Sequence, residues 1–213
     1  MVASISRAEF ARRRRALMRI MGDDAIAIVP TAPMRCRSKD IYYFYRANSD
    51  FFYLTGFSEP EAVAVLVPGR AKAVFVLFVQ PRDRVRETWE GERAGPLGAK
   101  HRYDAGEAYP ISQLDRILPR LMESRSEVYF WLGYCSDWDQ RVSGWINGLR
   151  RAQGRDGRHP PRELVALDDL MHELRLRKSH SQVALGSRAD ARSCQHRRTR
   201  SPARHAFLPP GAR

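Results

Sequence analysis

Few residues in this chain have the types and spacing that catalysis needs. His172-Glu173 would begin the His-Glu-x-x-His motif of a zinc metalloprotease, but Leu176 stands where the second histidine is required. Asp168-Asp169 has the form of a paired carboxylate, yet it precedes an apolar helical run, which is typical of a helix N-cap. Cys135 has no local base, which favours a core thiol over a nucleophile. We therefore predict no catalytic residue, no metal ligand and no cofactor-binding residue in this chain.

One segment, Tyr42–Ala62, combines many aromatic residues with a single charged motif. Within it, Arg46 and Asp50 could form an ion pair that fixes a loop. Asn48 and Ser49 could add local Asx-type hydrogen bonds to the backbone. Two interpretations follow. The segment is either a rigid turn that leads into a sheet, or a surface for recognition or subunit contact, since exposed aromatic residues usually have something packed on them.

Cysteine usage and hydropathy indicate the cellular compartment. The three cysteines are far apart and odd in number, which argues against a disulfide framework and against clustered zinc ligands. The longest apolar run, Ala73–Val79, is much shorter than the roughly 18–20 residues that span a bilayer. The N-terminus has no continuous apolar stretch of the signal-peptide kind. We expect a soluble cytoplasmic protein without membrane contact.

The charge is strongly basic and unevenly distributed. The 213 residues include 37 basic and 24 acidic side chains, for a net charge of +13, and four of the basic ones are lysines. The last 28 residues hold seven arginines and one acid, Asp190. A basic surface can bind nucleic acid, but the run Arg12–Arg15 is interpreted as the solvated face of a helix. Nucleic-acid binding is therefore kept only as a minor alternative.

Hydrophobic periodicity predicts a mixed α/β domain over residues 4–178. Ser6 and Glu9 form a capping box that opens a helix to about Met21. Further helices are expected over residues 111–122, where Pro119 should end or kink the helix, over 138–151, and after Asp168. Strands are expected at four places: Ala25–Val29, Ala62–Val67, Ala73–Val79 and Glu127–Leu132.

The composition changes at about residue 185. Of the last 28 residues, 22 are Ala, Arg, Ser, Pro, Gly or His, so residues 186–213 are predicted to be a disordered, Arg-rich tail. A functional basic tail would have this composition, and so would a GC-rich gene translated out of frame. The abrupt change after an ordered helical approach favours the frameshift. Residues 179–185 are expected to begin a linker or helix into a further domain.

Several motifs together resemble one known family. Tyr45–Ala62 resembles the N-terminal domain of bacterial aminopeptidase P, the Xaa-Pro aminopeptidases. Other matching segments follow in the family's order: Ile5–Leu17, Arg37-Ser38, Thr88-Trp89-x-Gly91 and His172–Ser179. The resemblance extends from residue 4 to about residue 185. It implies a mixed-sheet, creatinase-like α/β module with flanking helices.

The family also implies a division of labour between two domains. A following pita-bread domain carries the catalysis, with two Asp, one His and two Glu holding two metal ions, usually manganese. A hydroxide shared by the two ions attacks the peptide bond before a penultimate proline. The matching positions would lie beyond residue 185, so the resemblance implies that this chain has no manganese ligands and is inactive alone.

The resemblance further implies what the N-terminal domain does. It supports oligomerisation and shapes the active-site entrance, so its partners would be its own catalytic domain, further subunits and proline-containing peptides. The candidate residues for the entrance or for subunit contact are Arg46, Asp50 and Trp89. Trp89 lies in a Gly-flanked segment, expected to be a loop, where its ring could stack on a proline; simple packing is the alternative. A stand-alone peptide-binding or assembly module is the alternative function.

Overall fold

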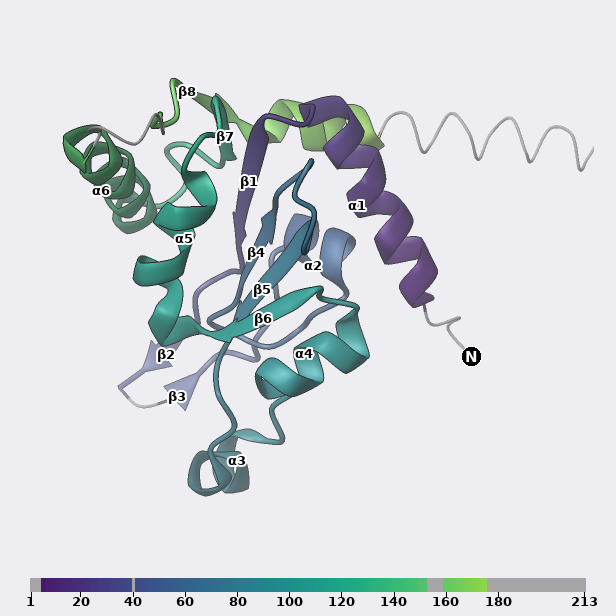
Figure 1. Ribbon diagram of the computed structural model, residues 1–213. Coiled ribbons are helices and arrows are strands. Elements are labelled where there is room, and N and C mark those ends of the chain that lie inside the picture. The colour runs from purple at the N-terminus through teal and green to yellow at the C-terminus, as the bar shows by residue number, and fades with distance from the viewer. Residues whose placement is uncertain (1–4, 40, 153–158, 176–213) are drawn as a thin grey trace, which may run out of the picture. The chain divides into compact units, whose positions relative to one another are not determined.

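The computed structural model describes residues 5–39, 41–152 and 159–175 (Figure 1). The chain divides into two compact units, residues 1–172 and residues 173–213. The first unit holds the central sheet and the helices that cover it. The domain end expected at residue 178, the linker at 179–185 and the Arg-rich tail at 186–213 all lie outside the described residues.

A six-stranded mixed sheet forms the centre of the first unit, in the order β6-β5-β4-β1-β7-β8. Strand β4 is antiparallel to β1 and to β5, whereas the pairs β1–β7, β5–β6 and β7–β8 are parallel. The strands are β1 (Ala25–Pro30), β4 (Val63–Leu66), β5 (Phe75–Val79), β6 (Glu107–Pro110), β7 (Glu127–Phe130) and β8 (Glu163–Ala166). The predicted mixed α/β fold and its four predicted strands are confirmed.

Helices and one small hairpin complete the unit (Figure 1). A two-stranded hairpin of β2 (Cys36–Ser38) and β3 (Ile41–Tyr42) stands apart from the main sheet. Residues 167–175 are also helical. The remaining helices are α1 (Arg7–Met21), α2 (Ser49–Thr55), α3 (Arg84–Glu90), α4 (Gly95–Tyr103), α5 (Leu114–Met122) and α6 (Ser136–Ala152), with a 3₁₀ turn at Ile111–Gln113.

The core lies between the sheet and the helices on its faces. Because strand side chains alternate between the two faces, β1 presents Ile26 and Ile28 to the side covered by α5 and α6. Leu118 of α5 and Val142 of α6 belong to the same buried cluster. Figure 1 shows α5 and α6 on one side of the sheet and α1 on the other. The central strands β1, β4 and β5 are buried along their whole length.

The helix predicted over residues 111–122 does not end at Pro119, so that part of the prediction is wrong. The first three residues form a 3₁₀ turn, and Pro119 lies inside α5, which continues to Met122. Proline removes one backbone hydrogen bond. The helix persists because its apolar side is buried against the sheet, where Leu114, Leu118 and Met122 are fully enclosed.

Gly56 ends α2 at a place that strongly favours glycine. Its φ is +69°, in the left-handed region, and a Cβ built on it would lie 2.6 Å from Cε2 of Phe10 in α1. We predict that Gly56→Ala lowers the free energy of unfolding by about 1–3 kcal/mol, from backbone strain and crowding. Urea unfolding of both proteins measures this difference.

Gly148→Ala is the matched control, because Gly148 lies inside α6 and a Cβ there would meet nothing within 4 Å. Alanine is the better helix former, so this variant should be neutral or more stable by up to about 1 kcal/mol. An equal loss of stability in both variants would contradict the assigned role of Gly56.

Candidate functional site: helix α2 and the aromatic hairpin before it

The charged motif of the aromatic segment begins a helix rather than a turn. The side-chain Oδ1 of Asn48 accepts hydrogen bonds from the backbone N–H of Asp50 at 2.8 Å and of Phe51 at 3.4 Å, which makes Asn48 the N-cap of α2. The local Asx-type bonding predicted for Asn48 is thus confirmed. The rigid turn proposed around it is replaced by a seven-residue helix, because Phe51 and Leu54 bury one side of that helix in the core.

Arg13 of α1 holds the far end of α2. Its Nη1 donates to the carbonyl oxygen of Tyr53 at 3.0 Å, and its Nε donates to Oε1 of Glu9 at 3.0 Å. The guanidinium carbon lies 4.2 Å from the centre of the Tyr53 ring. The last carbonyls of a helix have no partners within the helix and carry partial negative charge. A guanidinium group from α1 therefore caps α2.

Arg14 also caps the end of α2, from a more deeply buried position. Its Nη1 donates to the carbonyl oxygen of Leu54 at 3.1 Å, and its guanidinium lies 4.1 Å from the centre of the Phe75 ring in β5. Asp104 is the ion-pair partner of Arg14 at 3.4 Å. Burial lowers the pKa of Arg14, and Asp104 opposes that shift.

The interpretation of Arg12–Arg15 as a solvated helix face is therefore wrong at its two central residues. Arg13 is 7% exposed and Arg14 is 3% exposed, whereas Arg12 and Arg15 are exposed as expected. A signal was present in the sequence, because Arg14 shares the helical spacing of Phe10, Leu17 and Met21 and so lies on the apolar stripe. Bonds to α2 carbonyls explain why arginine is tolerated there.

The three candidate residues lie on two separate elements. Arg46 is exposed in the segment between the hairpin and α2, and Asp50 is half-buried in the first turn of α2. Their expected ion pair stays a prediction. Trp89 lies in the last turn of α3, and Gly91, at a φ of +91°, caps the end of that helix. The expectation that Trp89 lies in a loop is thus wrong, because Asp83 caps a helix that extends to Glu90.

The hairpin that precedes α2 exposes a cluster of large apolar side chains. Tyr42 and Tyr43 are 54% and 58% exposed, and Phe44 is fully exposed at 105%. Ile41 beside them is 59% exposed. Such grouped exposure is typical of a contact surface rather than of scattered surface residues. We call residues 41–44 the aromatic tip. Residues 42–44 belong to the segment Tyr42–Ala62, for which a recognition or subunit-contact surface was one of the two interpretations of the sequence.

Tyr45 differs from its neighbours because it is anchored. Its hydroxyl makes a 2.6 Å hydrogen bond with the Thr31 hydroxyl and donates to the carbonyl oxygen of Ala32 at 3.2 Å. Burial raises the pKa of Tyr45, and the bond to Thr31 partly opposes this. The base of the aromatic tip is thus attached to the end of β1, which keeps the tip in a defined position.

Glu59, just beyond α2, joins this region to α4. Its Oε1 accepts a 2.8 Å hydrogen bond from the backbone N–H of Ala94, the residue that precedes α4. Burial raises the pKa of Glu59, and the bond from Ala94 opposes that shift in part. The carboxylate is therefore less favoured in the folded chain than in the unfolded chain.

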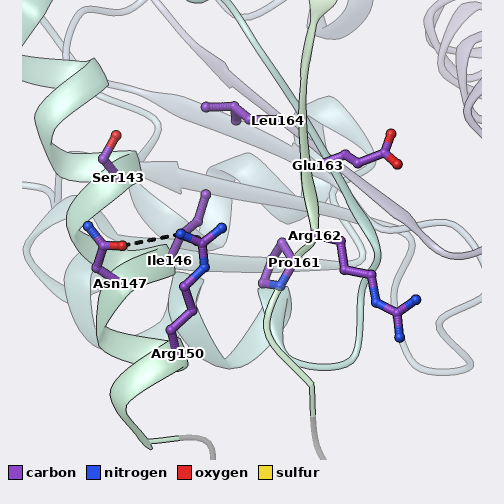
Figure 2. A pocket seen from close by; sticks show the side chains of 8 residues that line it. All are labelled: Ser143, Ile146, Asn147, Arg150, Pro161, Arg162, Glu163 and Leu164. Carbon is purple, nitrogen blue, oxygen red and sulfur yellow. Dashed lines mark hydrogen bonds between the residues drawn. The ribbon is translucent and has the colours of Figure 1, made fainter.

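A hollow of about 220 Å³ lies between α6 and the edge strand β8 (Figure 2). Ile146, Pro161 and Leu164 contribute its apolar lining. Arg150 at its mouth donates to Oδ1 of Asn147 at 3.5 Å, and Figure 2 shows Arg162 extending away from α6. Because its charged groups do not converge on one point, this hollow does not have the arrangement that catalysis needs.

The residues that the structure describes do not fit a dinuclear metal centre. Within the ranges 5–39, 41–152 and 159–175, no three or more His, Cys, Asp or Glu side chains are grouped so that they could hold a metal ion. Two manganese ions would need about five ligands in one cavity.

In the same described ranges, no helix is long and apolar enough to cross a membrane.

This six-stranded mixed sheet and its covering helices define a mixed α/β domain that exposes a group of large apolar side chains at the aromatic tip. The family model of the aminopeptidase P N-terminal domain matches residues 10–129, and the chain belongs to that family. The Xaa-Pro aminopeptidase of Escherichia coli (strain K12) is 36% identical over 189 residues, which are 88% of this chain and 43% of that protein. The resemblance seen in the sequence is confirmed.

Other relatives match in the same way. The mitochondrial intermediate cleaving peptidase 55 of Arabidopsis thaliana is 30% identical over 187 residues, covering 88% of this chain and 35% of that protein. The solved structure of Pseudomonas aeruginosa aminopeptidase PepP is 52% identical, with a TM-score of 0.75, and the match covers 79% of this chain and 38% of that one. The chain thus spans about two fifths of the length of these relatives.

We predict that Arg14→Leu lowers the free energy of unfolding by about 2–3 kcal/mol, because it leaves the Leu54 carbonyl without its buried donor. Arg19→Leu is the control, since Arg19 is an exposed arginine of the same helix and its replacement should change stability by less than about 0.5 kcal/mol. Chemical denaturation measures both. Similar losses in the two variants would contradict the capping role of Arg14.

The pKa of Glu59 gives a prediction with a defined sign. Because burial raises this pKa in the folded chain, the stability linked to Glu59 is present at low pH and declines as the pH rises through the raised value. Glu59→Gln keeps an oxygen that can accept from Ala94 but cannot ionise. As the pH rises from 4 to 7, the free energy of unfolding of Glu59→Gln should therefore increase relative to that of the parent chain. A difference that does not change with pH would refute this.

Proposed function

We propose that this chain acts as the N-terminal domain of a manganese-dependent Xaa-Pro aminopeptidase, an enzyme that releases the residue before a penultimate proline. The observation that carries the proposal is the match of 88% of this chain to 43% of the Escherichia coli Xaa-Pro aminopeptidase. In this proposal the two manganese ions and the catalytic residues belong to a domain that follows residue 185. The chain itself assists the enzyme without carrying out the reaction.

The aromatic tip supports a role in assembly. Its exposed rings offer apolar area that a second surface can cover, and the anchored Tyr45 keeps them in one position, which lowers the entropy lost on contact. The proposed partners are the enzyme's own catalytic domain and the neighbouring subunits of a homo-oligomer. Proline-containing peptides would be the substrates, and the cytoplasm the proposed location.

Arg46, Asp50 and Trp89 are proposed to lie at the substrate entrance or at a subunit contact. Arg46 supports this because it is a charged, exposed side chain directly beside the aromatic tip. Trp89 supports it by its position in a short helix that ends at Gly91. The exposed aromatic tip would also serve a stand-alone peptide-binding or assembly module, which is the second candidate function.

We predict that the 213-residue chain, supplied with excess Mn²⁺, releases no residue from Xaa-Pro peptides, because the proposal assigns the metal ligands to another domain. Full-length Escherichia coli Xaa-Pro aminopeptidase is the positive control in the same assay. Release of the N-terminal residue by the purified chain, persisting through repeated purification, would refute the proposal.

A chimera distinguishes an enzyme domain from a stand-alone module. Residues 1–175 of this chain would replace the corresponding part of the Escherichia coli enzyme. We expect manganese-dependent cleavage and the oligomeric state of the parent enzyme. Phe44→Ser in the chimera should weaken assembly or activity, whereas Leu97→Ser, at an apolar residue of α4 that is 75% exposed, should change neither. A folded but inactive chimera would favour the stand-alone module.

Trp89→Ala in the active chimera tests the entrance role. Stacking of an aromatic ring contributes about 0.5–1.5 kcal/mol, so kcat/KM for Xaa-Pro peptides should fall about two- to tenfold. Thr88→Ala, at the neighbouring residue of α3, is the control and should leave kcat/KM unchanged. Equal effects of the two variants would assign the loss to disturbance of α3.

A further inference from the structure

A basic pocket lies away from the aromatic tip, between α1, the β4–β5 turn and the segment that joins α4 to β6. Its volume is about 540 Å³. Arg14 and Arg15 of α1 line one wall, and Arg70 and Lys72 of the β4–β5 turn line the opposite wall. Asp104 lies at its third side. Four cationic side chains from two separate parts of the sequence therefore border one cavity.

The carboxylates near this pocket balance only part of that charge. Glu107 is buried and accepts from Arg70 at 2.7 Å and from Lys72 at 3.0 Å. Burial of Glu107 disfavours its charged form, but these bonds outweigh that effect and the pKa of Glu107 is lowered. Asp104 is the partner of Arg14. Two carboxylates thus face four cations, which leaves an excess of two positive charges.

Arg14 supplies a buried positive charge at the pocket wall. Its side chain is 4% exposed, while Asp104, at 3.4 Å, is 65% exposed and hence only a weak counter-charge. Among the described residues, Arg14 donates through Nη1 to Leu54 and through Nη2 to Asp104. A buried guanidinium whose carboxylate partner is itself largely exposed gains further stabilisation from an anion that approaches it.

Each wall provides one exposed donor, Lys72 from the β4–β5 turn and Arg15 from α1. Lys72 is 77% exposed, and Arg15 is an exposed residue whose Nε makes only a long bond of 3.4 Å to the Ala11 carbonyl oxygen in the described part of the chain. Arg15 can turn toward a ligand without breaking a core contact, and the ammonium of Lys72 has three donors, so it can bond a ligand while it keeps its bond to Glu107. An excess of two charges, and guanidinium groups that bind phosphate oxygens in pairs, favour a dianion over a single carboxylate.

We propose that the basic pocket binds a phosphate group, free or on a small phosphomonoester, between Arg14 and Arg15 of α1 and Lys72 of the β4–β5 turn. Bound phosphate joins α1 to the hairpin of β4 and β5 and so stabilises the packing of α1 on the sheet. The site is separate from the proposed peptidase chemistry, and its test does not depend on catalysis.

Isothermal titration calorimetry on the 213-residue chain, at constant ionic strength, tests the proposal with inorganic phosphate and with AMP. We expect saturable binding of at least one of the two, and tighter binding of AMP would identify a phosphomonoester. Arg15→Gln and Lys72→Gln should each weaken binding about tenfold, since a charge-assisted hydrogen bond is lost. Unfolding curves verify that both variants fold.

Arg84→Gln is the matched control, because it removes the same charge from an exposed residue of α3 outside the pocket. It should leave phosphate binding unchanged. The absence of saturable binding of both ligands would overturn the proposal. So would an equal loss in Arg84→Gln, because that result would show attraction by the overall charge of the chain rather than a site.

Discussion

The capping of α2 by two arginines of α1 is the interaction on which the arrangement of this domain depends. Arg13 and Arg14 donate to the carbonyl oxygens of Tyr53 and Leu54, which have no partners within the helix. The same Arg14 lies over Phe75 of the central sheet. This pair of side chains therefore joins α1 to α2, and Arg14 also connects both helices to the sheet. Without these bonds, the carbonyl oxygens at the end of α2 would lose their donors, and among the described residues each buried guanidinium would keep only its carboxylate partner as a counter-charge, Glu9 for Arg13 and Asp104 for Arg14.

The capping of α2 by Arg13 and Arg14 also helps to position the aromatic tip, the surface on which the proposed function depends. Since α2 is held at its end by α1 and capped at its start by Asn48, the chain just before it has a defined position. Tyr45 attaches the same stretch to the end of β1. The aromatic tip is thus exposed on a rigid base. A rigid apolar surface loses little entropy on contact, which suits assembly with the much larger remainder of an aminopeptidase.

Much of the fold could be predicted from hydrophobic pattern. The runs at β1, β4, β5 and β7 are apolar because those strands are buried, and burial makes the pattern continuous. The edge strands β6 and β8 are partly exposed, so their sequences lack a continuous apolar run. Helix α2 was not predicted because three of its seven residues are aromatic and one is threonine, and these residue types favour strands in isolation. Its cap and its buried side decide the helix.

The sequence by itself determined the family and the mixed α/β class, because both depend on residue types and local spacing. Only the tertiary structure decided the roles of individual charges. Arg12 and Arg13 are neighbours in the sequence, yet one is exposed and the other is buried against α2. The pairing of Arg14 with Leu54, forty residues apart, and the basic pocket formed with Lys72 depend on which segments meet. Local pattern carries no information about such distant partners, since the free energy that selects them comes from burial and hydrogen bonding in the folded chain.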